Sequence, residues 1–187
     1  NTWDVSLITD MSELFKDKTT FNDDIGEWNL SNVTKMNYMF WNAVAFDRDI
    51  SSWNVSSVAE MGHVFRNATT FNQDISSWNV SNVYDLGGMF WDALAFNQDI
   101  SSWDISSVIN TTAMFRNATT FNQDISSWDI SNIVNMSQMF RDAIAFNQDI
   151  STWDVSNVNL IDDIFLNANA LSDENKCSIH NSFSMND

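Results

Sequence analysis

The chain has 187 residues, a formal net charge of −17 and 44% hydrophobic residues, enough for a core, which argues against a disordered chain. It has no proline and four glycines, which excludes collagen-like and Pro-rich designs. The acidity argues against nucleic acids and anionic membranes as partners, because both need clustered Lys and Arg, and no apolar run is long enough for direct membrane insertion.

A repeat of 25 residues fills almost the whole chain. It begins with Trp, and a Phe follows twelve residues after each Trp; the Trp positions are Trp3, Trp28, Trp53, Trp78, Trp103, Trp128 and Trp153. We therefore divide the chain into a seven-unit repeat solenoid (1–175) and a C-terminal capping tail (176–187). The opening on Asn1, with no signal peptide, suggests a segment of a longer protein.

The first part of each unit reads as a short strand. In the second unit, Trp28 and Leu30 fall on one side of an extended chain, with Asn29 between them on the other side. Alternation with a period of two is typical of a half-buried strand. The Trp side is expected to face the core.

The next part of each unit reads as a helix. On a helical wheel, with 100° between successive residues, five apolar residues of the second unit lie within a 120° arc. They are Val33, Met36, Met39, Phe40 and Ala43. Ser31 stands where a helix N-cap is expected, and a serine recurs at this position in all seven units. Each unit is therefore predicted to be strand, turn, helix and return loop.

The repeat resembles two known patterns. The spacing of Ile50, Trp53 and Val55 is similar to the core of leucine-rich repeats, and the run Phe121–Ser131 resembles the BspA-like repeats of bacterial surface proteins. The latter are also known as a domain of unknown function in mycoplasma and Listeria surface proteins. The resemblance implies an extracellular or cell-surface location, a link to adhesion and no shared catalytic residue. Thr111, Lys18 and Asn175 depart from the pattern.

The predicted fold class is α/β: a leucine-rich-repeat-like solenoid of seven strand–helix units. Parallel strands stack about 4.8 Å apart, whereas packed helices need roughly 8–10 Å. Such a solenoid must curve, with short parallel strands on the concave face and helices outside.

Small polar side chains are predicted to cover the concave face and to form its binding site. The residue after each Trp points away from the core, and serines flank it. The candidate binding residues are Asn29, Asn54, Asn79, Asp104, Asp129, Asp154, Ser52, Ser77, Ser102 and Ser127. A solvated sheet face needs such residues in any case, so the pattern also fits a purely structural role.

A second candidate surface lies on the predicted helices. The residue after each conserved Phe falls outside the buried arc, which predicts exposed rings with cationic side chains stacked between them. This outer-face alternative comprises Trp41, Arg66, Trp91 and Arg116. It could contact another module or only cover the helices.

An acidic ladder recurs in the return loop, where like charges would repel unless something offsets them. Its members are Asp24, Asp49, Asp74, Asp99, Asp124 and Asp149. Backbone N–H groups of the turn could satisfy these carboxylates, or Ca²⁺ could bind between rungs, and the two readings stay open.

No motif predicts catalysis, a resident metal or a cofactor, so we expect no enzyme. His63 and His180 lie at unrelated positions of the repeat, and the single cysteine, Cys177, reads as a small hydrophobic residue of the tail.

The expected function is an extracellular module for adhesion to, or recognition of, a protein or glycan. The first alternative is a spacer or stalk of a large surface protein, next to further repeat modules. A remote alternative is an ice- or mineral-binding surface, against which the predicted curvature argues.

Overall fold

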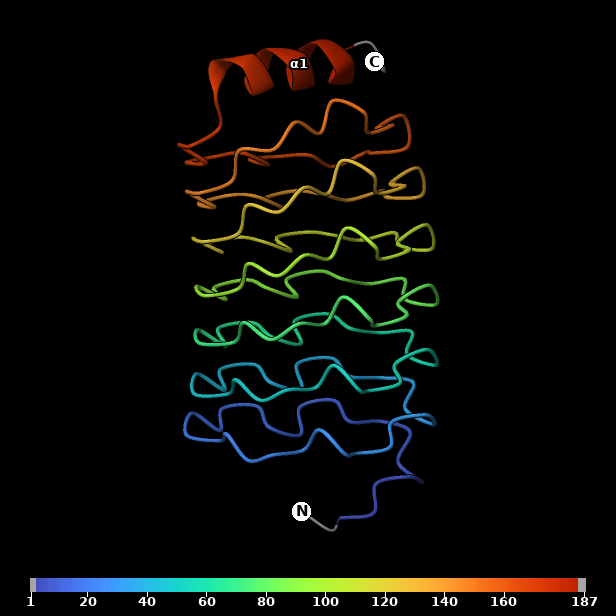
Figure 1. Cartoon of the computed structure of the whole chain (residues 1–187). Coiled ribbons are helices and arrows are strands. Elements are labelled where there is room, and N and C mark those ends of the chain that lie inside the picture. Colours follow the sequence, from blue (N-terminus) through green and yellow to red (C-terminus); the bar gives the residue numbers. More distant parts are fainter. Residues whose placement is uncertain (1–2, 185–187) are drawn as a thin grey trace.

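The repeat forms a column of seven stacked coils, which we call rungs, and a single helix lies across one end (Figure 1). The computed structural model describes residues 3–184, and the helix α1 spans Asp173–Phe183. Rung 1 begins at Trp3 and rung 7 at Trp153, each rung being one 25-residue unit. The predicted register of the repeat is therefore the register of the rungs.

The predicted strand–helix architecture is wrong. Within residues 3–184, α1 is the only helix, and the rungs are joined by isolated parallel bridges rather than by strands of a sheet. One bridge links each pair of neighbouring rungs, through Asp10, Lys35, Glu60, Asp85, Asn110, Asn135 and Leu160. The column is thus not an α/β solenoid of the leucine-rich-repeat kind.

The segment expected to be helical consists of consecutive tight turns. Met39 N–H donates to the carbonyl of Met36 at 3.1 Å, which is a three-residue span rather than the four of an α-helix. Tyr38 and Asn42 have φ of 61° and 63°, in the left-handed region that an α-helix excludes. Ser31 caps no helix, because turns rather than a helix follow it, and its own N–H donates to the side-chain oxygen of Asn29.

The remaining N–H groups of these turns join one rung to the next. In each of the six interfaces, four N–H groups at alternate positions donate to four carbonyls of the following rung; Phe40 N–H to the carbonyl of Val64, at 2.9 Å, is one example. An α-helix would use those donors internally. The turns therefore let the rungs stack closely through the backbone.

The column is straight, so the predicted curvature and concave face are also wrong (Figure 1). Ring centroids of the stacked pairs Trp53–Trp78 and Phe46–Phe71 lie 6.2 and 6.0 Å apart, nearly the same spacing at two places of the coil. Curvature was expected only because helices are wider than strands. Its absence removes the argument against an ice- or mineral-facing surface, which stays an untested alternative.

Columns of identical side chains fill the core, as predicted. Trp103 is 3% exposed and its indole N–H donates to the carbonyl of Ile75 at 3.1 Å, a bond repeated from Trp53 to Trp153. Leu30 is buried and Asn29 is exposed, as the alternating pattern indicated. Trp3 is 69% exposed at the N-terminal end, but the Trp and Phe rings of these columns pack against those of neighbouring rungs, so stability comes from nearest-neighbour stacking.

Candidate functional site

The residues after each Trp form an exposed column on one side of the stack, which we call the Asn29 column. Its members are Asn29, Asn54, Asn79, Asp104, Asp129 and Asp154. Each side-chain oxygen accepts the N–H of the serine two residues on, as Asn54 does from Ser56 at 3.1 Å. Hydrogen bonds from the hydroxyl and the N–H of Ser106 hold the pKa of Asp104 below its ordinary value of 3.8.

The second half of the predicted binding face is a column of serines that is also tied to the backbone. The hydroxyl of Ser52 donates to the carbonyl of Gly26 at 2.8 Å, and that of Ser77 to the carbonyl of Ser51 at 2.8 Å. Ser102 and Ser127 donate to the preceding rung in the same way, at 3.1 and 3.4 Å. These hydroxyl protons link rungs, so a ligand would meet the serines as acceptors.

The acidic ladder of the return loop caps turns. Its six carboxylates each accept the N–H two residues on, for instance Ser51 N–H to Asp49 at 2.9 Å. The N–H and then the hydroxyl of Ser51 keep the pKa of Asp49 below 3.8. Among residues 3–184, no three His, Cys, Asp or Glu side chains lie where they could hold a metal ion.

Cations and aromatic rings alternate in a half-buried stripe along the column. Arg66 lies 4.9 Å from the ring of Trp41 and 3.7 Å from that of Trp91, and Arg116 lies 4.5 Å from Trp91 on the next rung. The predicted interleaving is confirmed, but the two Trp rings are half-buried rather than exposed. Each ring is already covered by cations, which stabilises the stripe and leaves little of either face to a ligand.

His63 lies far along the column from His180 and Cys177, so these three residues do not form one site. His63 has φ of 59° and stacks on Tyr38 with ring centroids 4.9 Å apart; burial and then the neighbouring charge of Arg66 lower its pKa. His180 and Cys177 lie on α1, where Cys177 is exposed, contrary to the expectation of a small hydrophobic residue packed in the tail. The predicted Ser/Asn/Asp face therefore contains none of these three residues.

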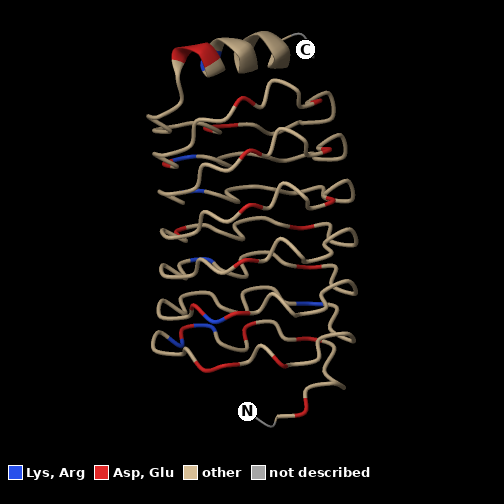
Figure 2. Ribbon diagram, viewed as in Figure 1, with Lys and Arg blue, Asp and Glu red and all other residues tan. Residues whose placement is uncertain are grey.

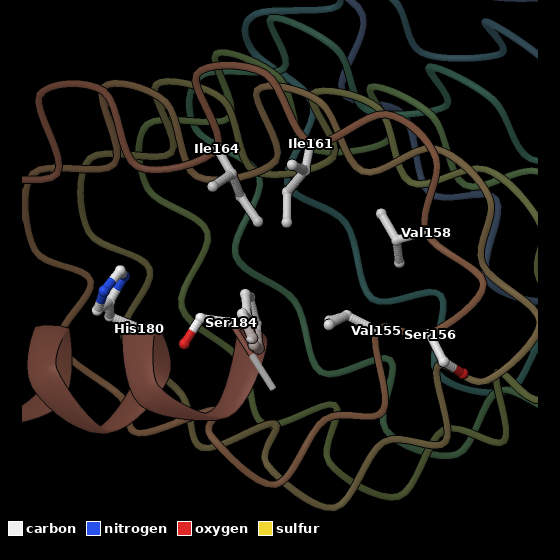
Figure 3. A pocket seen from close by; sticks show the side chains of 8 residues that line it. Val155, Ser156, Val158, Ile161, Ile164, His180 and Ser184 are labelled. Carbon is white, nitrogen blue, oxygen red and sulfur yellow. The ribbon is translucent and has the colours of Figure 1, made fainter. Parts of the chain in front are cut away.

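The sequence reasoning missed a hollow at the C-terminal end. Figure 3 shows Val158, Ile161 and Ile164 of the last rung facing α1 across a cavity of about 360 Å³. α1 could have been found in the sequence, because Ser172 caps it by accepting the N–H of Asn175, and Asp173 begins its acidic first turn. The sequence analysis predicted a capping tail over 176–187 but no helix in it.

Acidic residues occur along the column from one end to the other, and Lys and Arg are few (Figure 2). No helix in residues 3–184 is long and apolar enough to cross a bilayer.

A family described as "Mycoplasma protein of unknown function, DUF285" matches the chain twice, over residues 1–103 and 93–187. The chain belongs to this family. Two overlapping matches to a repeat-containing family agree with the seven stacked rungs. No curated protein matches the chain.

Proposed function

We propose that this chain is a non-enzymatic repeat module of a cell-surface or secreted protein, and that it recognises an extended protein or glycan through the Asn29 column. Its place in the DUF285 family supports the reading as a repeat module. The extracellular setting rests on the resemblance of Phe121–Ser131 to BspA-like surface repeats.

The observation that supports this proposal most directly is a row of side-chain amides whose orientation is fixed and whose N–H groups are free to donate. In Asn54 and Asn79, the side-chain oxygen is held by a serine N–H, and the amide nitrogen makes no hydrogen bond within residues 3–184. Both side chains are exposed and lie one rung apart. Each such amide is fixed before binding, which lowers the entropy lost when a ligand is bound.

The ligand class follows from the strength of single contacts. One hydrogen bond contributes a net of about 0.5–1.5 kcal/mol, so useful affinity needs several adjacent rungs. An extended polymer can meet several rungs, whereas a small metabolite cannot. We therefore assign the column to a glycan chain or an extended peptide.

The test is a glycan and peptide array probed with the chain, followed by N54D/N79D. Asp104 shows that aspartate fits this position and keeps the turn, so the double variant preserves the backbone while it replaces the two amide donors with carboxylates. Affinity for a ligand found on the array should fall at least tenfold. An unchanged affinity, or loss of binding only in W41A/W91A, would assign the ligand to the cation–aromatic stripe instead.

A spacer is the second candidate, because the column is straight and its polar side chains largely bond to its own backbone (Figure 1). A spacer predicts no ligand on the array. It also predicts that removing residues 78–102, one whole rung, shortens the column without loss of the parent protein's function.

A further inference from the structure

The two ends of the column present complementary backbone groups. At the C-terminal end, the N–H groups of four alternate residues have no acceptor in residues 3–184; we call them the donor row, and they belong to Ile161, Asp163, Phe165 and Asn167. At the N-terminal end, four carbonyls lack donors in the same residues; we call them the acceptor row, and they belong to Asp10, Ser12, Leu14 and Lys16. In all six internal interfaces, the same four donors meet the same four acceptors.

The side chains of the two rows are complementary in the same register. Ile161 is 38% exposed, whereas its position in the other six rungs is at most 2% exposed; those residues are Met11, Met36, Met61, Leu86, Thr111 and Met136. Leu14 is 40% exposed, and its counterparts Met39 and Met89 are fully buried. Within residues 3–184, no rung lies against either side chain. The C-terminal end could therefore pack against a rung like rung 1, and the N-terminal end against a rung like rung 7.

The N-terminal end also contains an unsatisfied buried donor. Within the described residues, the indole nitrogen of Trp28 is buried without a partner, whereas Trp53 donates to the carbonyl of Ile25 at the end of rung 1. In the register of the two rows, the equivalent carbonyl of a second copy belongs to Asn175, which lies in α1, so it becomes available only when α1 is displaced. Leaving such a buried donor unpaired is unfavourable.

α1 covers only part of the C-terminal end. It is held there by the buried Ile179, by Phe183, which packs against the core, and by hydrogen bonds from Asn175 to the carbonyl of Asn147 and from Ser182 to the carbonyl of Ser151. Figure 3 shows α1 on one side of the coil, separated from Ile161 by the hollow. α1 thus occupies the place where part of a further rung would stack, and the hollow beside it shows that it does not fill that place.

We propose that the donor row hydrogen-bonds to the acceptor row of a second copy of this chain. In this proposal α1 covers the same end and must be displaced before the second copy can bind. Only this head-to-tail pairing matches donors with acceptors, because pairing two like ends would oppose N–H to N–H or carbonyl to carbonyl. Such a contact is heterologous and does not close, so it would grow into filaments unless α1 limits it. The inference is independent of the proposed ligand binding.

The test is sedimentation velocity and light scattering of the full chain with α1 loosened by Ile179→Asp. The unmodified chain should stay at 21.4 kDa, whereas the average mass of the variant should rise with concentration beyond that of a dimer. Cys177→Asp is the matched control, because it places the same charge on an exposed position of the same helix and should leave the mass unchanged. Ser172→Ala, which removes the helix cap but no buried side chain, should give a smaller rise.

The contact is identified by second changes in the Ile179→Asp background. Leu14→Lys in the acceptor row and Ile161→Lys in the donor row should each restore the monomer. Ile144→Lys is their control, because Ile144 is 51% exposed on the side of an internal rung. The proposal is overturned if Ile179→Asp is monomeric at every concentration although circular dichroism shows that α1 is lost and that the column still melts cooperatively. It is equally overturned if the assemblies persist with Leu14→Lys or dissociate with Ile144→Lys.

Discussion

The recurring Trp fills the core of its own rung and also hydrogen-bonds to an earlier part of the column. From Trp53 onward its ring is buried in the core and its indole N–H donates to the carbonyl of the residue 28 positions earlier, as Trp103 does to Ile75. The aromatic spacing alone predicted the burial. The hydrogen bond was not predictable, because it depends on how a rung lies over its neighbour.

Trp103→Ala should lower the free energy of unfolding by about 3–5 kcal/mol, because it leaves a cavity and removes the indole hydrogen bond to Ile75. Trp91→Ala is the control, since Trp91 is half-buried and loses mainly its contacts with Arg66 and Arg116. Urea denaturation followed by circular dichroism measures both. Equal losses for the two variants would contradict the assignment of one ring to the core and the other to the stripe.

The capping aspartates should make the folded chain less stable at acid pH. Hydrogen bonds from the serines two residues on keep the pKa values of Asp49, Asp74 and Asp99 below the ordinary value of 3.8. A lowered folded-state pKa means that this stabilisation is fully present above the unfolded-state pKa and is lost as pH falls through the folded-state pKa.

The melting temperature should therefore hold steady down to about pH 4 and drop below it. The triple variant D49N/D74N/D99N retains the side-chain oxygens but cannot titrate, so its melting temperature should fall less over the same range. A variant that declines in parallel with the unmodified chain would show that other groups govern the acid transition.

At the scale of the element, the helix prediction found the right side chains and the wrong backbone. Turns that repeat every three to four residues bury the same positions as a helical face, so Met36, Met39 and Phe40 are buried in either case. A further signal was in the sequence: the second left-handed position of every rung is Asn or Asp. Those residues are Asp17, Asn42, Asn67, Asp92, Asn117, Asp142 and Asn167. Asn and Asp tolerate positive φ better than other non-glycine residues.

The left-handed positions allow a direct test of turns against helices. Ala113 has φ of 54°, where a side chain costs about 1 kcal/mol, so Ala113→Gly should be neutral or stabilising by up to that amount. Ala118 is buried in the same rung without a positive φ, and Ala118→Gly should be destabilising by about 0.5–1 kcal/mol. Thermal unfolding of the two variants gives the comparison. In a helix, both changes would be destabilising, which would refute the turn structure.

At the scale of the whole molecule, the register, the core and the order of the columns were readable from the 25-residue period. The straightness and the complementary ends were not, because they follow from rung-to-rung hydrogen bonds that no single unit displays. The same applies to the candidate face. Its residues were correctly grouped on one side, but the sequence did not show that Asn54 is held by Ser56 and that Ser52 is bonded to the preceding rung.

The net charge of −17 makes the column repel itself, so salt should raise its melting temperature by screening. The turn-capping role of the acidic ladder leads to a more specific expectation. Because each Asp of the ladder already accepts a backbone N–H, CaCl₂ should stabilise the chain no more than NaCl of equal ionic strength. A ligand of the native state would add about 2.7 kcal/mol at a hundredfold excess over its Kd, which thermal melts resolve easily. A calcium-specific rise that D74N/D99N abolishes would instead make the ladder a calcium site, and the capped turns would then be its scaffold.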